Sequence, residues 1–112
     1  RSMGLTSFRL SIEWPRVQPT TDSHPAEPPP FDHTAIAHYA KILAACRTFG
    51  LEPVVTLQHF THPAWLGTDA WLRDDTPALF AKFTETVVRG VNTHLTDSHN
   101  QPPIHWFVTL NE

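Results

Sequence analysis

Hydrophobic and polar residues alternate over residues 7–14, which have the sequence SFRLSIEW. A period of two is typical of a β-strand whose two faces meet different surroundings. The hydrophobic face would carry Phe8, Leu10, Ile12 and Trp14, and the polar face Arg9, Ser11 and Glu13. We therefore expect a strand over residues 7–14 with a guanidinium group on its polar face.

Two longer stretches have apolar residues three and four positions apart, the spacing of amphipathic helices. The first covers residues 31–50, with Asp32 or Thr34 as its cap and Gly50 at its end. The second covers residues 76–95, with Thr76 as its cap and Pro77 in its first turn. The expected core positions are Ile36, Tyr39, Leu43 and Cys46 in the first helix and Leu79, Phe80, Phe83, Val87, Val91 and Leu95 in the second.

Two further strands are predicted from runs of β-branched and aromatic residues. Residues 53–60, PVVTLQHF, would form a strand that is buried on both faces, and residues 104–110, IHWFVTL, would form another. The strands and helices then alternate, which favours right-handed crossovers and a parallel α/β sheet. A doubly wound nucleotide-binding fold would need a glycine-rich phosphate turn, and the four glycines of the chain do not form one. We therefore expect a segment of a (β/α)8 TIM barrel, with residues 1–112 as part of one catalytic domain and no second domain.

Composition limits the classes of partner. The chain has 112 residues and a net charge of −3, which favours neither nucleic acid nor a membrane surface as a partner. No apolar run approaches the roughly 18 residues of a membrane span, and the first residues, RSMGLTSFRL, lack the apolar core of a signal peptide. Cys46 is the only cysteine, so no disulfide forms within the chain. Low cysteine content favours a cytoplasmic location and leaves secretion open.

Several blocks of the sequence resemble glycoside hydrolase family 1, the β-glucosidase and β-galactosidase family. They occur in the family's order, and they are FRLSIEWPRVQP (8–19), HYAKILAACRTFGLEPVVTLQHFTHPAWL (38–66), AWL (70–72) and WFVTLNE (106–112). The resemblance implies a fragment from the N-terminal half of the barrel, approximately its second to fourth strands. It also implies a β-glycoside or oligosaccharide substrate, no cofactor, and remaining barrel strands that are required for folding.

The resemblance assigns roles to five residues of this chain. Glu112 would be the general acid/base, and Arg9 would pair with the nucleophilic glutamate and keep it ionised. Asn111 would bind the 2-hydroxyl of the sugar that is cleaved from its aglycone, and His59 another hydroxyl of the same sugar. Phe60 replaces the tryptophan of many family members and so removes an indole donor. All these residues except Arg9 lie at or beyond the carboxyl ends of predicted strands, where parallel α/β barrels carry their chemistry.

Glycosidic bond cleavage with retention requires two carboxyl groups about 5 to 5.5 Å apart. Glu112 follows a hydrophobic strand, and burial beside a second carboxylate would raise its pKa, as an acid catalyst requires. The family's nucleophile belongs to the seventh strand, which these residues do not reach. The isolated chain is therefore expected to be inactive and poorly folded. The alternative hypothesis is an inactive barrel fragment or a carbohydrate-binding relative.

Other polar and aromatic residues have simpler interpretations. Glu13 and Arg16 are expected to form a local ion pair, and most of the four tryptophans are expected to be packing residues. His59 and His62 form an H-x-x-H pair, but on a strand and loop this spacing does not place both rings on one side, and no third ligand is evident. No metal site is therefore predicted.

Overall fold

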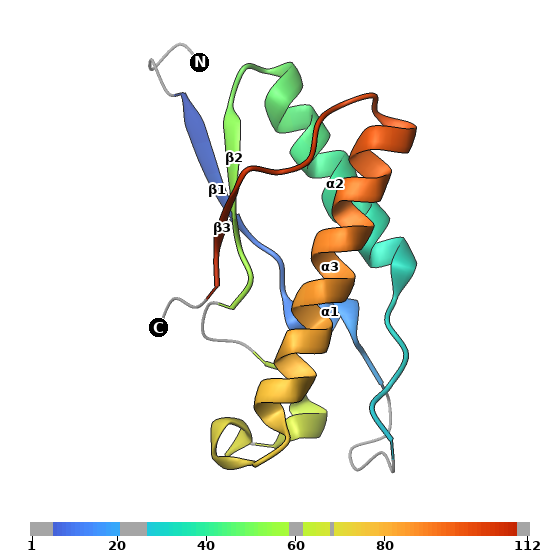
Figure 1. The fold of residues 1–112 in the computed structure, drawn as a ribbon, viewed down its shortest axis with the longest axis vertical. Helices are drawn as coiled ribbons and strands as arrows, with labels where there is room; N and C mark the ends of the chain where they lie inside the picture. The colour runs from blue at the N-terminus through green and yellow to red at the C-terminus, as the bar shows by residue number, and fades with distance from the viewer. Residues whose placement is uncertain (1–5, 21–26, 59–61, 68, 110–112) are drawn as a thin grey trace.

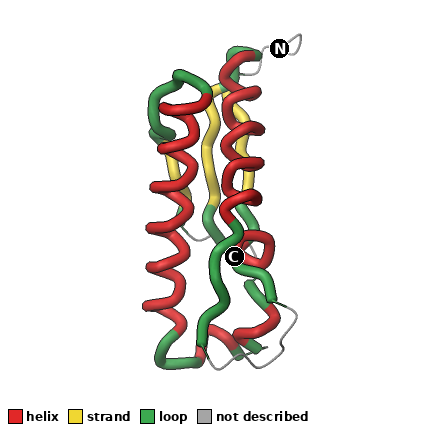
Figure 2. Tube along the Cα trace, turned by 90° about the vertical axis from the view of Figure 1, so that its right-hand side faces the viewer, coloured by secondary structure: helices red, strands yellow, loops and turns green. Residues whose placement is uncertain are grey.

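The structure is a computed structural model that describes residues 6–20, 27–58, 62–67 and 69–109. Its elements, in chain order, are β1 (Ser7–Ser11), α1 (Trp14–Val17), α2 (His33–Thr48), β2 (Glu52–Thr56), the 3-10 helices η1 (Ala64–Leu66) and η2 (Ala70–Leu72), α3 (Thr76–Ser98) and β3 (Trp106–Val108). The strands form one parallel sheet in the order β1-β2-β3. Helices α2 and α3 lie side by side over one face of this sheet (Figures 1 and 2). The predicted alternation of strands and helices in a parallel α/β unit is confirmed.

Strand β1 ends three residues earlier than the alternating pattern predicts. Trp14 was expected on the strand, but it begins the short helix α1. Pro15 explains the change, because its fixed φ and missing N–H suit the first turn of a helix. Glu13 remains extended, and its carbonyl oxygen accepts the Val17 N–H at 3.3 Å.

Helix α2 has the predicted cap at its start and the predicted glycine after its end. The Asp32 side chain accepts the backbone N–H groups of Thr34 and Ala35 at 3.0 and 3.1 Å. Gly50 has a φ of +80°, a conformation in which L side chains are strained, and it donates to the Arg47 carbonyl at 2.9 Å. The helix itself is shorter than residues 31–50, because both predicted end segments serve as its flanks.

Helix α3 differs from its prediction at both ends. Its N-cap is Asp75, and Thr76 is the first helical residue, whose hydroxyl donates to the carbonyl oxygen of Ala70. The helix continues three residues past Leu95, through exposed polar positions that carry no apolar signal. None of the helices that the structure describes is long and apolar enough to span a membrane.

The second and third strands are shorter than their sequence patterns. Strand β2 starts one residue early at Glu52 and ends at Thr56, and its burial on both faces is confirmed toward its end, where Val55 and Thr56 have no exposed surface. Beyond the strand, the Leu57 N–H still donates to the Val108 carbonyl at 2.8 Å. Strand β3 is confined to Trp106–Val108 in the described part of the chain.

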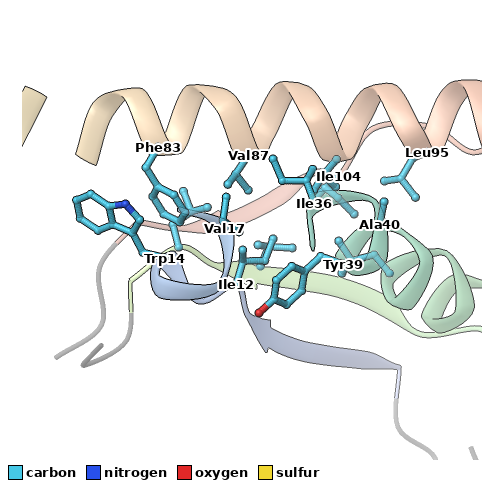
Figure 3. Packing of buried hydrophobic residues seen from close by; sticks show 14 of the residues in the cluster. Ile12, Trp14, Val17, Ile36, Tyr39, Ala40, Phe83, Val87, Leu95 and Ile104 are labelled. Carbon is cyan, nitrogen blue, oxygen red and sulfur yellow. The ribbon is translucent and has the colours of Figure 1, made fainter. Parts of the chain in front are cut away.

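The core lies between the sheet and the two long helices (Figure 3). Most of the predicted helix positions are in it, and the fully buried ones are Ile36, Leu43, Phe83, Val87, Val91 and Leu95. Cys46 was expected there as well, but it is only partly buried. It lines a shallow apolar pocket near the free edge of β1, together with Phe8 and the exposed Phe49. The helical spacing of apolar residues therefore predicted correctly which side of α2 faces the sheet. It did not predict how much of Cys46 is buried near the edge of β1.

Helices α2 and α3 approach closely where Gly90 meets Ile36. A β-carbon at Gly90 would lie 2.8 Å from Cγ2 of Ile36, which is 1% exposed and stiff because it is β-branched. Gly90→Ala would gain about 1 kcal/mol of helix propensity and lose about 1–3 kcal/mol to overpacking. We expect a net loss of about 1 kcal/mol in the free energy of unfolding, seen as a lower melting temperature of the full-length protein.

The matched background for this substitution is Ile36→Leu, which moves the branch of the side chain away from Cβ. Gly90→Ala should then lower the melting temperature less than it does beside isoleucine. An equal decrease in both backgrounds would show that the contact between these two residues is not the cause.

Candidate active site

The face of the sheet that the helices leave uncovered carries the polar side chains. Leu10 packs against the core on the helix side, so Arg9 projects to the other face, as the alternation predicts. In register, Arg9 stands opposite Val54, and Thr56 stands opposite both Ser11 and Val108. In a barrel whose helices lie outside, this uncovered face would be the interior.

Arg9 is held by a contact across two strands. Its Nε donates to the hydroxyl oxygen of Thr56 at 2.9 Å. Neither terminal nitrogen of the guanidinium group bonds to another described residue, and Arg9 has no carboxylate partner among them. The predicted pairing of Arg9 with the nucleophilic glutamate therefore stays a prediction.

Four of the five predicted site residues lie outside the described residues. They are His59, Phe60, Asn111 and Glu112. The described strands nevertheless run toward them, because Thr56 and Val108 are paired in register and lie three residues before His59 and four before Glu112. Both segments thus continue from the carboxyl edge of the same parallel sheet. The roles of these four residues stay predictions.

The amino end of β3 is anchored by side chains of both long helices. The guanidinium group of Arg47 donates to the carbonyl oxygens of Pro102 and Pro103, the latter at 2.7 Å. From α3, the side-chain oxygen of Asn92 accepts the Ile104 N–H at 2.9 Å. These bonds satisfy backbone groups that β-pairing leaves free, and they fix where β3 enters the sheet.

A network centred on Gln18 fixes the segments that follow β1 and β2. Its side chain accepts the Trp14 indole N–H at 2.9 Å and donates to the Pro29 carbonyl at 2.8 Å. Its backbone carbonyl accepts the Trp65 indole N–H at 3.0 Å. Gln18 is 3% exposed, so these bonds are made in a buried setting, where unpaired polar groups are costly.

The tryptophans are only partly explained by packing. Trp14 stacks on Phe83 with ring centroids 5.1 Å apart, and Trp14 and Trp65 are both buried as predicted. Trp71 also contacts Trp14, at a centroid distance of 6.5 Å, although it is 44% exposed. Trp106 is 61% exposed and stands opposite Val54, on the same face of the sheet as Arg9.

The ionisable groups near this edge form few contacts. Glu13 and Arg16 make the predicted ion pair, with Oε2 and Nε 3.3 Å apart and both side chains exposed. Elsewhere, the hydrogen bond from Arg73 lowers the pKa of the Asp75 carboxyl, and burial raises the pKa of the Cys46 thiol. Neither group belongs to the uncovered face of the sheet, so neither shift bears on the chemistry expected there.

Among the described residues, no group of three histidine, cysteine, aspartate or glutamate side chains is arranged to hold a metal ion. The Nε2 atom of His62 lies 2.9 Å from the Gly67 carbonyl oxygen, which places that ring in the loop after β2. Its H-x-x-H partner His59 lies outside the described residues.

Two polar residues at the end of β2 were not singled out from the sequence. Thr56 has no exposed surface, and Gln58 is 4% exposed, with a side-chain oxygen that has no hydrogen-bond partner among the described residues. Both belong to the β-branched run that we predicted to be buried on both faces, and their burial agrees with that prediction. Strand alternation could have identified Thr56. Val54 is paired with Arg9, and Thr56 lies two residues farther along the same strand, so its side chain is on the same face of the sheet as Arg9.

A parallel β-α-β-α-β unit whose helices cover one face of the sheet is consistent with part of a (β/α)8 barrel, a fold that carries its functional residues at the carboxyl ends of its strands. A sequence profile of glycosyl hydrolase family 1 matches residues 1–110. The chain belongs to glycosyl hydrolase family 1.

Relatives and a solved structure agree with this membership. The chain is 26% identical over 117 aligned residues to a bifunctional β-D-glucosidase/β-D-fucosidase of Bifidobacterium breve, covering 100% of the chain and 22% of that protein. It is 32% identical over 112 residues to a 6-phospho-β-glucosidase of Clostridium longisporum, covering 98% and 21%. The β-glycosidase BGL167 matches in structure with a TM-score of 0.77 and 36% identity, over 99% of the chain and 23% of that protein.

These proteins show which fold the chain is part of and how much of it the chain covers. The solved neighbours are TIM-barrel β-glycosidases, so the small parallel sheet and its helices correspond to part of such a barrel. The chain spans about a fifth of the length of the relatives that it matches.

Proposed function

We propose that this chain is a segment of a retaining β-glycosidase that hydrolyses terminal β-linked sugars by double displacement. The match to glycosyl hydrolase family 1 across residues 1–110 is the observation that carries the proposal. Within the barrel, the segment would supply the second to fourth strands. It would contribute the general acid/base, and the nucleophile would come from another part of the protein.

Glu112 is proposed to move the proton in both steps. Its carboxylic acid protonates the aglycone oxygen while the nucleophilic carboxylate attacks the anomeric carbon, so that the glycosidic bond breaks and a glycosyl-enzyme forms. The ionised Glu112 then takes a proton from water, whose oxygen attacks the same carbon and releases the nucleophile. A raised pKa, from burial next to a second carboxylate, would keep Glu112 protonated for the first step.

The remaining residues are proposed to bind sugar or to hold charge. Asn111 and His59 have donors and acceptors that suit sugar hydroxyl groups, and Phe60 would offer an apolar surface beside them. Arg9 projects from the uncovered face, and its two terminal nitrogens have no partner among the described residues, which suits a paired carboxylate. An adjacent positive charge lowers the pKa of a carboxyl group and keeps the nucleophile ionised.

The assay uses the full-length protein that carries this segment and a panel of aryl β-glycosides. We expect hydrolysis, and NMR spectra taken early in the reaction should show the β-anomer of the free sugar before mutarotation, because two displacements restore the original configuration. Initial release of the α-anomer would contradict the retaining mechanism. Absence of hydrolysis across the panel would favour the inactive or carbohydrate-binding alternative.

The sugar panel needs both plain and phosphorylated glycosides, because the named relatives include a β-D-glucosidase/β-D-fucosidase and a 6-phospho-β-glucosidase. The 112-residue chain alone is the matched control. We expect no hydrolysis by this chain, since one carboxyl group cannot perform both displacement roles. Measurable turnover by the purified chain would overturn the division of the two carboxyl groups between this segment and the rest of the protein.

A further inference from the structure

We propose that Thr56 is a positioning residue for the reaction, because its hydroxyl group holds Arg9 in the orientation in which the guanidinium group meets the nucleophile. This inference rests on the function proposed above and deepens it. It assigns a positioning role to the buried Thr56 side chain on β2. In this role Thr56 acts through Arg9 and contacts neither the sugar nor the reacting atoms.

The contact joins two strands that local sequence does not connect. Arg9 lies on β1 and Thr56 lies 47 residues later on β2, and the Nε to Oγ1 distance of 2.9 Å is that of a well-formed hydrogen bond. The Thr56 side chain has no exposed surface, whereas Arg9 remains exposed. The threonine is therefore the rigid partner of the pair, and its β-branched side chain has few rotamers to exchange.

The register shows the direction in which this bond tilts the arginine. The Cα atom of Arg9 is paired with Val54, whereas the hydroxyl that binds Nε belongs to Thr56, two residues farther along β2. Two residues of a parallel strand correspond to about 6.6 Å. The Arg9 side chain therefore leans toward the carboxyl edge of the sheet, from which the segments bearing His59 and Glu112 continue.

The choice of nitrogen matters for the chemistry. Thr56 occupies Nε, and the two terminal nitrogens have no partner among the described residues. A guanidinium group binds a carboxylate through two parallel N–H groups, which a single anchoring bond at Nε can leave available. Without the hydroxyl, the long arginine side chain would sample more rotamers and would spend less time against the carboxylate.

The direct test replaces Thr56 with valine in the full-length protein, which removes the acceptor and keeps the branched shape. We expect kcat/KM to fall about tenfold, the scale of one lost hydrogen bond to a charged group. Thr56→Ser keeps the hydroxyl and should retain most of the activity. Thr84→Val on α3 is the matched control, because it makes the same chemical change at a threonine whose side-chain oxygen has no hydrogen-bond partner in the part of the chain that the structure describes.

The pH profile separates positioning from a general loss of structure. A less constrained Arg9 lowers the pKa of the nucleophile less, so the ionised form appears at a higher pH. The acidic limb of kcat/KM for Thr56→Val should move upward by about half a pH unit, while Thr56→Ser and Thr84→Val keep the wild-type limb. An unchanged limb in Thr56→Val would overturn the proposal.

A double-mutant cycle tests whether Thr56 acts through Arg9. Arg9→Lys keeps the charge and removes the Nε donor, so adding Thr56→Val to Arg9→Lys should lower kcat/KM by less than twofold. Additive losses would show that the threonine acts in another way. If Thr56→Val folds poorly, Thr56→Ala compared with Thr56→Ser isolates the same hydroxyl, and equal losses in these two variants would also reject the proposal.

Failure of the proposed role of Thr56 can be distinguished from failure of the proposed glycosidase function. If the wild-type protein hydrolyses β-glycosides and Thr56→Val matches it in rate and pH profile, the glycosidase assignment stands and the role of Thr56 is rejected. If the wild-type protein does not hydrolyse any glycoside, the glycosidase assignment itself is rejected.

Discussion

Replacing Glu112 with glutamine in the full-length protein should lower kcat/KM about a thousandfold on glycosides whose leaving group is a sugar or alkyl alcohol. These leaving groups depart as poor alkoxides unless a proton is supplied, and an amide at neutral pH cannot supply it. On aryl glycosides with an activated phenol the first step should be much less affected. The measurement is a comparison of steady-state rates on the two substrate types.

The pH profile gives a second readout for Glu112. A general acid acts in its protonated form, so activity should decline as the pH rises through the pKa of Glu112, and this alkaline limb should disappear in Glu112→Gln. Glu13→Gln is the matched control, because it makes the same chemical change at a carboxylate that forms an exposed ion pair with Arg16. It should change kcat/KM by less than twofold. Full activity of Glu112→Gln on disaccharides would remove Glu112 from its proposed role.

Replacing Arg9 with methionine should lower kcat/KM about a hundredfold near neutral pH, because the charge that holds the nucleophile ionised is lost while the length of the side chain is kept. The pKa of that carboxyl should rise. The acidic limb of kcat/KM should therefore move upward by about one pH unit, farther than for Thr56→Val. Both values come from the pH dependence of kcat/KM measured with subsaturating substrate.

Arg9→Met also leaves the buried Thr56 hydroxyl without its partner, which costs stability as well as activity. The control is therefore Arg9→Met combined with Thr56→Val, which removes both groups and should recover some of the melting temperature but none of the activity. If the double variant instead regains wild-type kinetics, or if Arg9→Met alone changes the rate less than twofold, Arg9 is an ordinary surface cation of the sheet.

Local signals predicted the helices well because the residues that start and stop a helix act on their immediate neighbours. Asp32 caps α2 by accepting the backbone N–H groups of Thr34 and Ala35, and Gly50 takes the positive φ after the end of the helix. The start of α1 was not predicted, because the alternation of apolar and polar residues continues to Trp14 and contains no information about the backbone conformation there. Pro15 was the local signal that the strand had ended.

The site was less predictable because its contacts join distant parts of the chain. Alternation placed Arg9 on the correct face, and the order of elements predicted the parallel edge to which β2 and β3 both lead. Nothing local to Thr56 indicates that its hydroxyl meets an arginine 47 residues away, since a threonine in a β-branched run is an ordinary strand former. The partial exposure of Cys46 is likewise decided by what covers the edge of β1 and not by its own helix.

The buried amide of Gln18 determines where this barrel segment can accept foreign loops. Because that one residue bonds to Trp14, Pro29 and Trp65, it fixes both ends of the connection that follows α1 and one end of the connection that follows β2. An exchange of loops between relatives that keeps Gln18 and Pro29 as the two boundaries of the insert therefore keeps the bond that joins them. A graft that replaced Gln18 itself would keep the backbone carbonyl that binds Trp65, but it would leave the Trp14 indole N–H and the Pro29 carbonyl without this side-chain partner.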